Sequence, residues 1–441
     1  MSIPSPSPVK RPLSLGVIFL TLYIDLIGFS IVFPLMPDML EHYLRTDGQV
    51  GLLGSFVALS DLIAGFLNKD HNFAAVLFGG FVASLFSILQ FIFAPIWGSL
   101  SDRKGRRPVL LWTVAGTAFG YLLWVLSGSF WMFVLSRVVC GAFGGNLSVA
   151  TAAVADVTSR EDRSKAMGLV GAAFGLGLIT GPSLGALAMH WNPLHEHPAL
   201  GILGVNPFSF PALLALGFSL FNLVWITLRF RESLDPAHRS EPAAERPRNA
   251  LKAILSLENP AVRRINLVAF VFSLSFVAME MTLTFLAAER FGYTARQNGM
   301  LLAFLGLCSI LTQGVLVRRL LKTMHEIQVL CIGLVCAVFG LVGLAFATRQ
   351  GMLYAALVFT SLGSGLVNPS STGLISLYSG AGEQGRVLGI FRSLGALSRA
   401  ITPVFAGALY WVFGSLTLYL AAACLAVWAL VLGLSLPKPQ K

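Results

Sequence analysis

The stretch Gly98-Ser-Leu-Ser-Asp102-Arg103-Lys104-Gly105-Arg106-Arg107-Pro108 decides the fold of this chain. It places four cations and one carboxylate between two apolar segments, each long enough to cross a bilayer. Charged side chains are costly inside hydrocarbon, so the sequence predicts that this turn lies at a water interface. The apolar segment on each side of it is then a membrane-spanning helix.

The overall composition agrees with a membrane protein. The chain has 441 residues, of which 56% are hydrophobic and 12% charged, and this excludes an ordinary soluble domain. A net charge of +11 could suggest nucleic-acid binding, but the cations are confined to short segments between apolar runs. We therefore expect no nucleic-acid partner.

Neither a metal site nor another cofactor is expected from the sequence. The five cysteines all lie in apolar segments and form no C-x-x-C pair, so no disulfide framework or zinc site is predicted. His195-Glu196-His197 could contact a metal, but two histidines in a loop are better explained as a solvated surface. The sequence shows no nucleophile–base pair on adjacent spans either, and we expect a protein that is not an enzyme.

The apolar pattern predicts an all-α membrane protein with twelve transmembrane helices in two six-helix halves. The predicted spans are 14–36, 76–99, 109–127, 130–155, 165–189, 209–228, 264–288, 297–320, 328–347, 351–377, 386–411 and 414–435. The predicted domains are an N-terminal tail (1–12), a first bundle (13–228), a polar linker (229–262), a second bundle (263–436) and a C-terminal tail (437–441). The first loop, about 38–75, contains an apolar stretch, Val50–Leu67, that is interpreted as an interfacial helix.

The distribution of lysine and arginine predicts the orientation. These residues concentrate in the loops on the side of the two termini, and few lie in the loops on the other side. Because cationic loops stay in the cytoplasm, both termini are expected there, in the plasma membrane or a bacterial inner membrane. The lipid bilayer is thus an expected partner, and the chain is expected to be a monomer.

Five ionisable residues fall inside the predicted spans, namely Asp25, Arg137, Glu280, Arg392 and Arg399. Such residues are rare in membrane helices and usually line a water-filled passage. Asp25 and Glu280 can each carry a proton there, with Glu280 preferred, although either acid could instead form a hydrogen bond between helices. Arg392 and Arg399 lie two turns apart on one helix face and suit an anionic group, or alternatively pair with the acids for structural reasons.

Uncharged polar residues inside the spans complete the predicted substrate site: Gln90, Asn146, Gln313 and Asn368. An internal repeat supports two related halves. Lys165-Ala-Met-Gly168 is followed by Pro182, and Arg386-Val-Leu-Gly389 is followed by Pro403. Each of these segments comes after a helix that contains one of the asparagines.

Several motifs resemble those of the major facilitator superfamily of transporters, and within it the drug:proton antiporter branch. They include the 98–108 turn, Arg137-Val-Val-Cys140-Gly141, the glycine series from Gly171 through Gly181-Pro182 to Gly185, Asp25-Leu-Ile-Gly28 with Pro34 and Pro37, and Arg392-Ser-Leu-Gly-Ala-Leu-Ser-Arg399. The chain is similar to tetracycline exporters of bacteria and to the tetracycline transporter-like proteins of animals. The resemblance covers nearly all twelve spans.

The resemblance implies roles for further residues. It implies that Arg137 contributes to proton coupling, and that Arg106 of the 98–108 turn pairs with Asp156 to hold one side of the protein shut. The expected gating residues are Gly98, Asp102, Arg103, Gly105, Arg106, Arg107, Asp156, Gly181 and Pro182. The equivalent turn in the second half, Val317-Arg318-Arg319, lacks the glycine and the acid, so only one strong latch is expected.

The family also implies alternating access and proton-driven efflux of small amphipathic compounds, including organic anions. Protons and a small-molecule substrate are therefore the expected partners. A proton-coupled symporter or importer of an organic anion would use the same fold, and the residues do not state the direction of transport.

Overall fold

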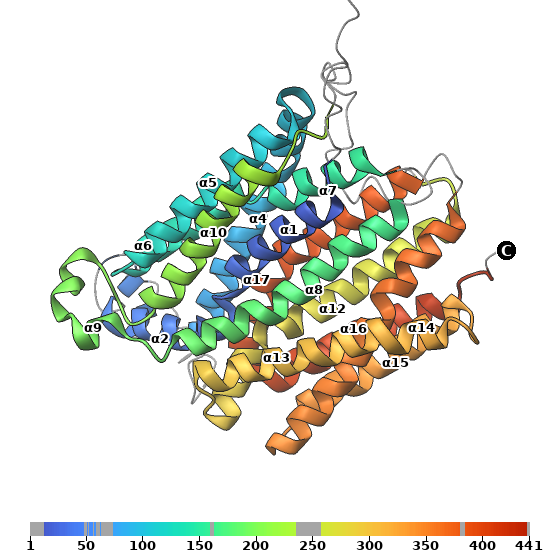
Figure 1. The fold of residues 1–441 in the computed structure, drawn as a ribbon. Helices are drawn as coiled ribbons and strands as arrows, with labels where there is room; N and C mark the ends of the chain where they lie inside the picture. The colour runs from blue at the N-terminus through green and yellow to red at the C-terminus, as the bar shows by residue number, and fades with distance from the viewer. Residues whose placement is uncertain are drawn as a thin grey trace, which may run out of the picture.

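The structure is a computed structural model that describes residues 13–47, 51, 53–55, 57–58, 62, 74–158, 163–234, 257–379 and 384–438. This part of the chain is all helical, as the sequence predicts (Figure 1). The N-terminal half contains α1 (Leu15–Ser30), η1 (Phe33–Leu35), α2 (Met36–Thr46), α4 (Ala74–Lys104), α5 (Arg106–Val125), α6 (Phe130–Phe143), α7 (Asn146–Val157), α8 (Arg163–Ala188), α9 (Pro193–Glu196), η2 (Pro198–Leu203) and α10 (Ser209–Arg229). The C-terminal half contains α12 (Pro260–Phe291), α13 (Ala295–Leu311), the π-helical turn η4 (Thr312–Leu316), α14 (Val317–Leu320), α15 (Glu326–Ala345), α16 (Gln350–Tyr378) and α17 (Gln384–Leu434).

The helices have the lengths needed to cross a bilayer. In the described part of the chain, nine helical segments are long and apolar enough to span a membrane. One of them, Ser393–Leu434, has 42 residues and turns at Gly414, where φ is 79°, so it is long enough for two crossings. With α8 and the shorter apolar α13, this element order is consistent with twelve crossings.

The two halves lie side by side and share a seam formed by two helix pairs. Within the halves, α1 packs on α8, α5 on α10, α12 on α17, and α15 on α16. Across the halves, α4 runs along α17 and α8 runs along α13 (Figure 1). The helix α8 is therefore sandwiched between α1 of its own half and α13 of the other half.

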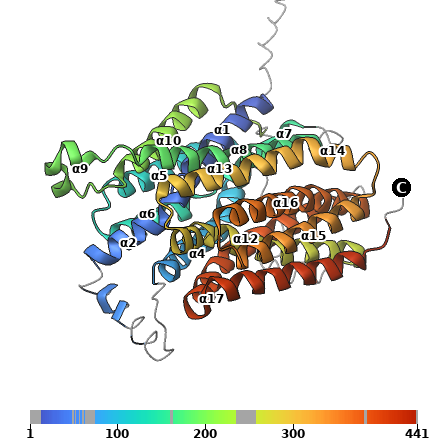
Figure 2. The ribbon, with the colours of Figure 1, turned by 90° about the horizontal axis from the view of Figure 1, so that it is seen from below.

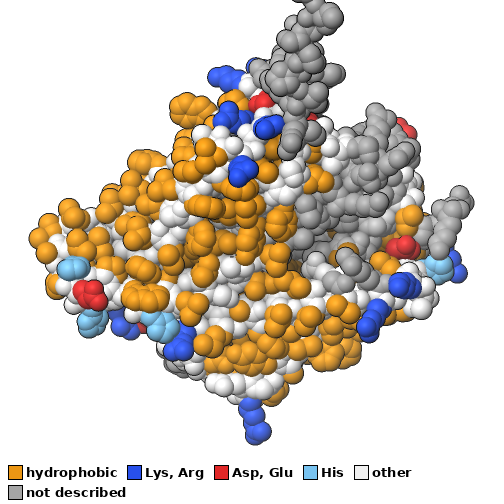
Figure 3. Space-filling view, in the orientation of Figure 1, with side chains coloured by type: hydrophobic (Ala, Val, Ile, Leu, Met, Phe, Trp, Pro, Cys, Tyr) orange, Lys and Arg blue, Asp and Glu red, His pale blue; other side chains and the backbone are white. Residues whose placement is uncertain are grey.

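The two ends of the bundle differ in what they contain. The helix α1 begins and α17 ends at the end that also carries the α4–α5 turn, and we call it the terminal end. The opposite end, here the distal end, carries α2, α9 and the first turn of α13 (Figure 2). Hydrophobic side chains cover the middle of the face seen in Figure 3, and Lys and Arg lie toward its ends, as expected for a surface in contact with lipid.

Glycine lets the halves approach each other closely along these helix pairs, including near the distal end. A Cβ atom on Gly80 of α4 would lie 2.3 Å from the carbonyl oxygen of Pro403 of α17. A Cβ atom on Gly299 of α13 would lie 2.0 Å from the Cβ of Ala186 of α8. The buried Ser84 hydroxyl also accepts a hydrogen bond from the backbone N–H of Val404, at 2.8 Å.

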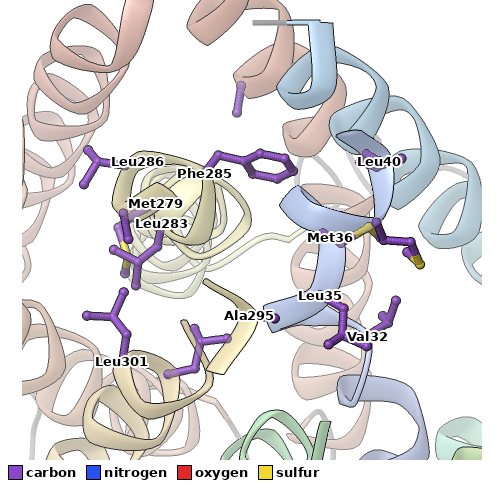
Figure 4. Close-up of a cluster of buried hydrophobic side chains, with 14 of the residues drawn as sticks. Val32, Leu35, Met36, Leu40, Met279, Leu283, Phe285, Leu286, Ala295 and Leu301 are labelled. Atoms are coloured by element: carbon purple, nitrogen blue, oxygen red, sulfur yellow. The ribbon is translucent and has the colours of Figure 1, made fainter. Parts of the chain in front are cut away.

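Apolar side chains from both halves seal this distal seam (Figure 4). Leu35 and Leu40 from the N-terminal half are fully buried, as are Leu283 and Leu301 from the C-terminal half. All four belong to one continuous hydrophobic cluster. The distal end is therefore closed in this conformation.

The structure differs from the sequence-based expectations at two places in the N-terminal half, one in a predicted loop and one in a predicted span. Residues 38–46 were expected in the first loop but belong to α2, because Pro37 pre-sets the first turn and Met36, Met39, Leu40 and Tyr43 present one buried face. The expected span 130–155 is divided at Gly144-Gly145 into α6 and α7. Most of the Val50–Leu67 stretch, and residues 235–256 of the expected linker, lie outside the described residues.

Candidate functional site

A small cavity lies between the halves, just beneath the distal seam. Its volume is about 70 Å³. That is room for a few water molecules and well below the roughly 300–1,000 Å³ of pockets that hold drug-sized ligands. Its walls are largely aromatic and apolar, and include Phe29, Phe33, Phe86 and Phe285.

Three of the predicted ionisable residues line this cavity and come from three helices. Arg137 is on α6, Glu280 on α12 and Arg399 on α17. The Arg399 guanidinium and the Glu280 carboxylate interact electrostatically across the α12–α17 packing. Both side chains are half-buried, which fits groups that face a cavity. With Glu280 ionised, the three groups carry a net charge of +1.

Arg137 is held by aromatic rings. Its guanidinium carbon lies 4.8 Å from the ring centroid of Trp124, 5.3 Å from Phe133 and 6.0 Å from Tyr121. Its Nε donates to the Ser136 hydroxyl at 3.2 Å, and one terminal nitrogen has no hydrogen-bond partner among the described residues. Cation–π contacts in a water-poor setting contribute about 2 kcal/mol or more, which offsets part of the cost of burying this charge.

Asp25 and Asn146 form a second polar site, within the N-terminal half. The Asn146 amide nitrogen donates to the Asp25 carboxylate at 2.7 Å, and the Asn146 carbonyl oxygen has no partner among the described residues. Tyr121 and Cys140 lie within electrostatic range of both Asp25 and Arg137, so this site and the cavity are neighbours. Neither Asp25 nor Asn146 lines the cavity itself.

The break between α6 and α7 is what positions Asn146. A Cβ atom on Gly145 would lie 2.6 Å from the Cβ of Trp97, so the chain can pass α4 there only without a side chain. Two side chains of α4 satisfy the carbonyl groups that the break leaves open. Trp97 donates to Ala142 at 2.7 Å, and Gln90 donates to Gly144 at 3.1 Å. Gln90 was predicted to bind substrate, but the structure gives its amide this structural contact.

The other predicted substrate residues do not meet in the cavity. Gln313 and Asn368 are exposed and are absent from its walls, and the side chain of Arg392 lies outside the described residues. The structure shows polar groups that the sequence analysis did not single out. The hydroxyls of Ser370, Ser371 and Thr402 are buried without a hydrogen-bond partner among the described residues. Hydroxyl residues are too common in membrane helices for the sequence alone to identify these three.

At the terminal end, the predicted latch residues do meet. Arg106 donates through Nε to Asp156 at 2.9 Å, and its Nη1 donates both to Asp102 and to the Ser101 hydroxyl. Gly105 has φ of 100°, a conformation that favours glycine, and this turn lets α5 start directly after α4. Gly98 faces Ser148 of α7, and Arg103 is exposed.

Glu232, which follows α10, contacts the predicted latch and is not identified by the sequence analysis. Its carboxylate accepts hydrogen bonds from the backbone N–H groups of Arg106 and Arg107, at 2.8 and 3.1 Å. It thereby caps the first turn of α5 from 126 positions away in the sequence. The next residue, Ser233, donates to Asp156 at 3.0 Å. No local pattern could have identified this contact, because the two segments meet only through the packing of α10 on α5.

The predicted glycine–proline motif of α8 makes close contacts with two neighbouring helices. Gly181 faces Ser30 of α1, where a Cβ atom would lie 2.0 Å from the hydroxyl oxygen. The carbonyl of Pro182 lies on the opposite face, against Gly299 of α13. The motif therefore packs α8 within its own half and across the seam.

Comparison with known proteins agrees with this architecture. The family model for the Major Facilitator Superfamily matches residues 18–403 and, in a second match, 327–441. The chain is 34% identical to mouse Major facilitator superfamily domain-containing protein 10, covering 93% of this chain and 90% of that protein. It is 30% identical to the class D tetracycline resistance protein of Salmonella ordonez, covering 86% of this chain and 85% of that protein.

Solved structures have the same fold. The crystal structure of the human organic anion transporter MFSD10 (TETRAN) superimposes with a TM-score of 0.74 at 30% identity, covering 97% of this chain and 100% of that chain. A bacterial homolog of the human lysosomal transporter Spinster, in an inward-facing and unoccupied conformation, gives a TM-score of 0.70 at 12% identity. It covers 95% of each chain, and at this identity the likeness concerns the fold alone.

Proposed function

This chain belongs to the Major Facilitator Superfamily and is a membrane-embedded transporter of small molecules, and on that premise we propose that it carries small amphipathic organic anions in a proton-coupled, alternating-access cycle. One observation carries the proposal. A single carboxylate, Glu280, shares an aromatic cavity with two guanidinium groups, Arg137 and Arg399. The guanidinium groups stay charged at any physiological pH, so the arginines suit an anionic group of a substrate. The aromatic walls suit the apolar part of the same substrate. That the human relative is described as an organic anion transporter supports this substrate class.

Glu280 is proposed as the proton carrier. It is the acid among the three charged groups that line the cavity, and it competes with any bound anion for Arg399. When Glu280 takes up a proton, that competition ends and the cavity charge rises from +1 to +2. Proton binding and anion binding therefore strengthen each other, because linkage between two sites is reciprocal.

This linkage bears on the direction of coupling. Antiport, which the resemblance implies, requires that proton and substrate exclude each other. A proton on Glu280 and a cationic substrate group beside Glu280 would exclude each other, because both neutralise the same carboxylate. An anionic substrate, in contrast, binds better when Glu280 is protonated and would therefore move together with the proton. We accordingly propose symport for anions, and retain antiport as the coupling for substrates that place a positive charge beside Glu280.

The seam suggests which side exchanges substrate in this conformation. The distal end is closed, and the latch contacts at the terminal end all lie within the N-terminal half, including the residues just after α10, and do not join it to the other half. The central site would therefore open toward the terminal end, which carries the basic loops. We propose that this end is cytoplasmic, and that residues 13–228 and 263–436 are the two bundles that rock about the central site.

The experiment that tests this proposal uses purified protein in liposomes with a fluorescent or radiolabelled aromatic carboxylate. A gradient that is acidic outside should drive accumulation of the anion inside, and a reversed gradient should expel it. Accumulation under an inside-acid gradient would establish antiport instead. Flux that ignores the gradient in both directions would reject proton coupling.

A further inference from the structure

We propose that Asp38 is a gating residue that clasps the distal end shut by capping α13 of the opposite half. Its carboxylate accepts a hydrogen bond from the backbone N–H of Ala295 at 3.0 Å, across 257 positions in the sequence. Asp38 lies in the first turn of α2, which the sequence analysis had expected to be loop. The sequence predicted a latch at the terminal end only.

The contact has the chemistry of a helix cap supplied from outside. The first N–H groups of a helix have no partner within the helix, and they attract negative charge. Thr294 and Gln297 form a capping box that serves other groups of this turn. Ala295 is the first residue of α13, and its N–H is satisfied by Asp38. Loss of Asp38 would leave that N–H without this acceptor.

The clasp is charged, whereas the other contacts described above at the distal end of the seam join apolar or neutral groups. The glycine contacts of α4 with α17 and of α8 with α13 are van der Waals contacts, and the Ser84–Val404 bond joins neutral groups. Asn298, one turn into α13, is fully buried, and its amide has no hydrogen-bond partner among the described residues. An unpaired buried amide disfavours the closed seam, and the Asp38 bond offsets part of that cost.

Alternating access makes this contact state-dependent. When the distal end opens, α2 and α13 must separate, so the bond can exist only in the distally closed state. A contact made in one state alone shifts the equilibrium toward that state. Asp38 therefore sets how often the distal end opens. This inference rests on the proposed transport cycle but on neither its substrate nor its coupling.

The test measures the opening directly, without substrate. Nitroxide labels at residues 197 and 349, both exposed at the distal end and in opposite halves, would report the separation by pulsed dipolar spectroscopy in nanodiscs, in a background without the native cysteines. Asp38→Ala should raise the ratio of open to closed molecules by roughly threefold to tenfold, the size expected for loss of a helix cap. Glu41→Ala is the matched control, because Glu41 is an exposed acid one turn further along α2 that pairs with Arg45.

A second variant removes the donor and leaves the carboxylate in place. Ala295→Pro lacks the N–H, and proline is well tolerated at the first position of a helix. It should open the distal end as Asp38→Ala does, and the double variant should show no more opening than Asp38→Ala alone. The clasp is rejected if either folded single variant keeps the wild-type distance distribution, if Glu41→Ala opens the protein equally, or if the two effects simply add. None of these outcomes bears on whether anions move with protons in liposomes.

Discussion

Arg137 shows how a single ionised residue can be kept inside a membrane bundle. Its guanidinium lies among the rings of Trp124, Phe133 and Tyr121, so its charge is fixed in place by packing. Arg399, by contrast, faces Glu280, whose charge can change by taking up a proton. The two arginines of the cavity therefore differ in their surroundings, because Arg137 lies among aromatic rings and Arg399 lies near a carboxylate. We assign anion selectivity to both residues, and proton linkage to the Arg399–Glu280 pair.

The assignment of Arg399 predicts a selective loss. Arg399→Ala should lower transport efficiency for anionic substrates by about tenfold to a hundredfold, the effect of losing one charged hydrogen bond, and should affect neutral amphipathic substrates much less. Initial rates for a carboxylate and for its neutral amide would show the difference. Arg349→Ala, which removes an exposed distal charge, is the control. Equal losses for both substrates would remove Arg399 from the anion site.

At the scale of helices, the sequence predicts the spans to within a few residues, because about twenty apolar residues per crossing is a strong local signal. For example, 209–228 was expected and α10 is Ser209–Arg229. What the sequence misses are features that depend on contacts between helices. Gly144-Gly145 breaks a span because Trp97 of α4 occupies the space, and Glu232 caps α5 because α10 brings it there.

The same limit applies to the candidate site. From their cost in lipid, all five intramembrane charges are expected to line one passage, and three of them line the cavity. The sequence could not predict which of Gln90, Gln313 and Asn368 would line the cavity, because uncharged amides cost less in lipid than charged groups do. An amide that satisfies a broken helix and an amide that is exposed look alike in a sequence.

The cap on α5 carries a prediction at this scale. Glu232→Ala leaves two N–H groups of the first turn of α5 without their acceptor, and should lower stability by about 1 kcal/mol. The melting temperature of the purified protein should therefore fall, and the α4–α5 turn should become more accessible to protease. Glu196→Ala, which removes an exposed acid of α9, should leave both unchanged. An unaltered melting temperature for Glu232→Ala would show that the cap adds little to the latch.

At the scale of the whole molecule, the two halves share one seam, and buried apolar side chains from both halves close it at the distal end. Between the terminal and the distal end, the charges are also unevenly placed: cationic loops lie at the terminal end, and ionisable groups line the cavity inside the bundle. This arrangement supports a carrier whose central site is reached from one side at a time. It also supports one orientation in the membrane, because cationic loops resist translocation.

That orientation predicts the accessibility of tags. An epitope fused to either terminus should bind antibody only after the membrane is permeabilised, since α1 begins and α17 ends on the side of the basic loops, which we propose is cytoplasmic. An epitope inserted between α9 and η2 should be reached in intact cells or right-side-out vesicles. The reverse pattern would invert the proposed topology and, with it, the side toward which the central site opens.

The proposed transport cycle depends on Glu280 linking proton binding to anion binding, and the Glu280→Gln variant tests this linkage most directly. Glutamine mimics the protonated acid, so anion exchange between equal pools should persist, with an affinity at neutral pH at least as high as that of the wild type. Accumulation driven by a pH gradient should be lost in the same liposomes. If the variant still accumulates the anion against its gradient when a pH difference is imposed, the proton is carried elsewhere and the central claim is wrong.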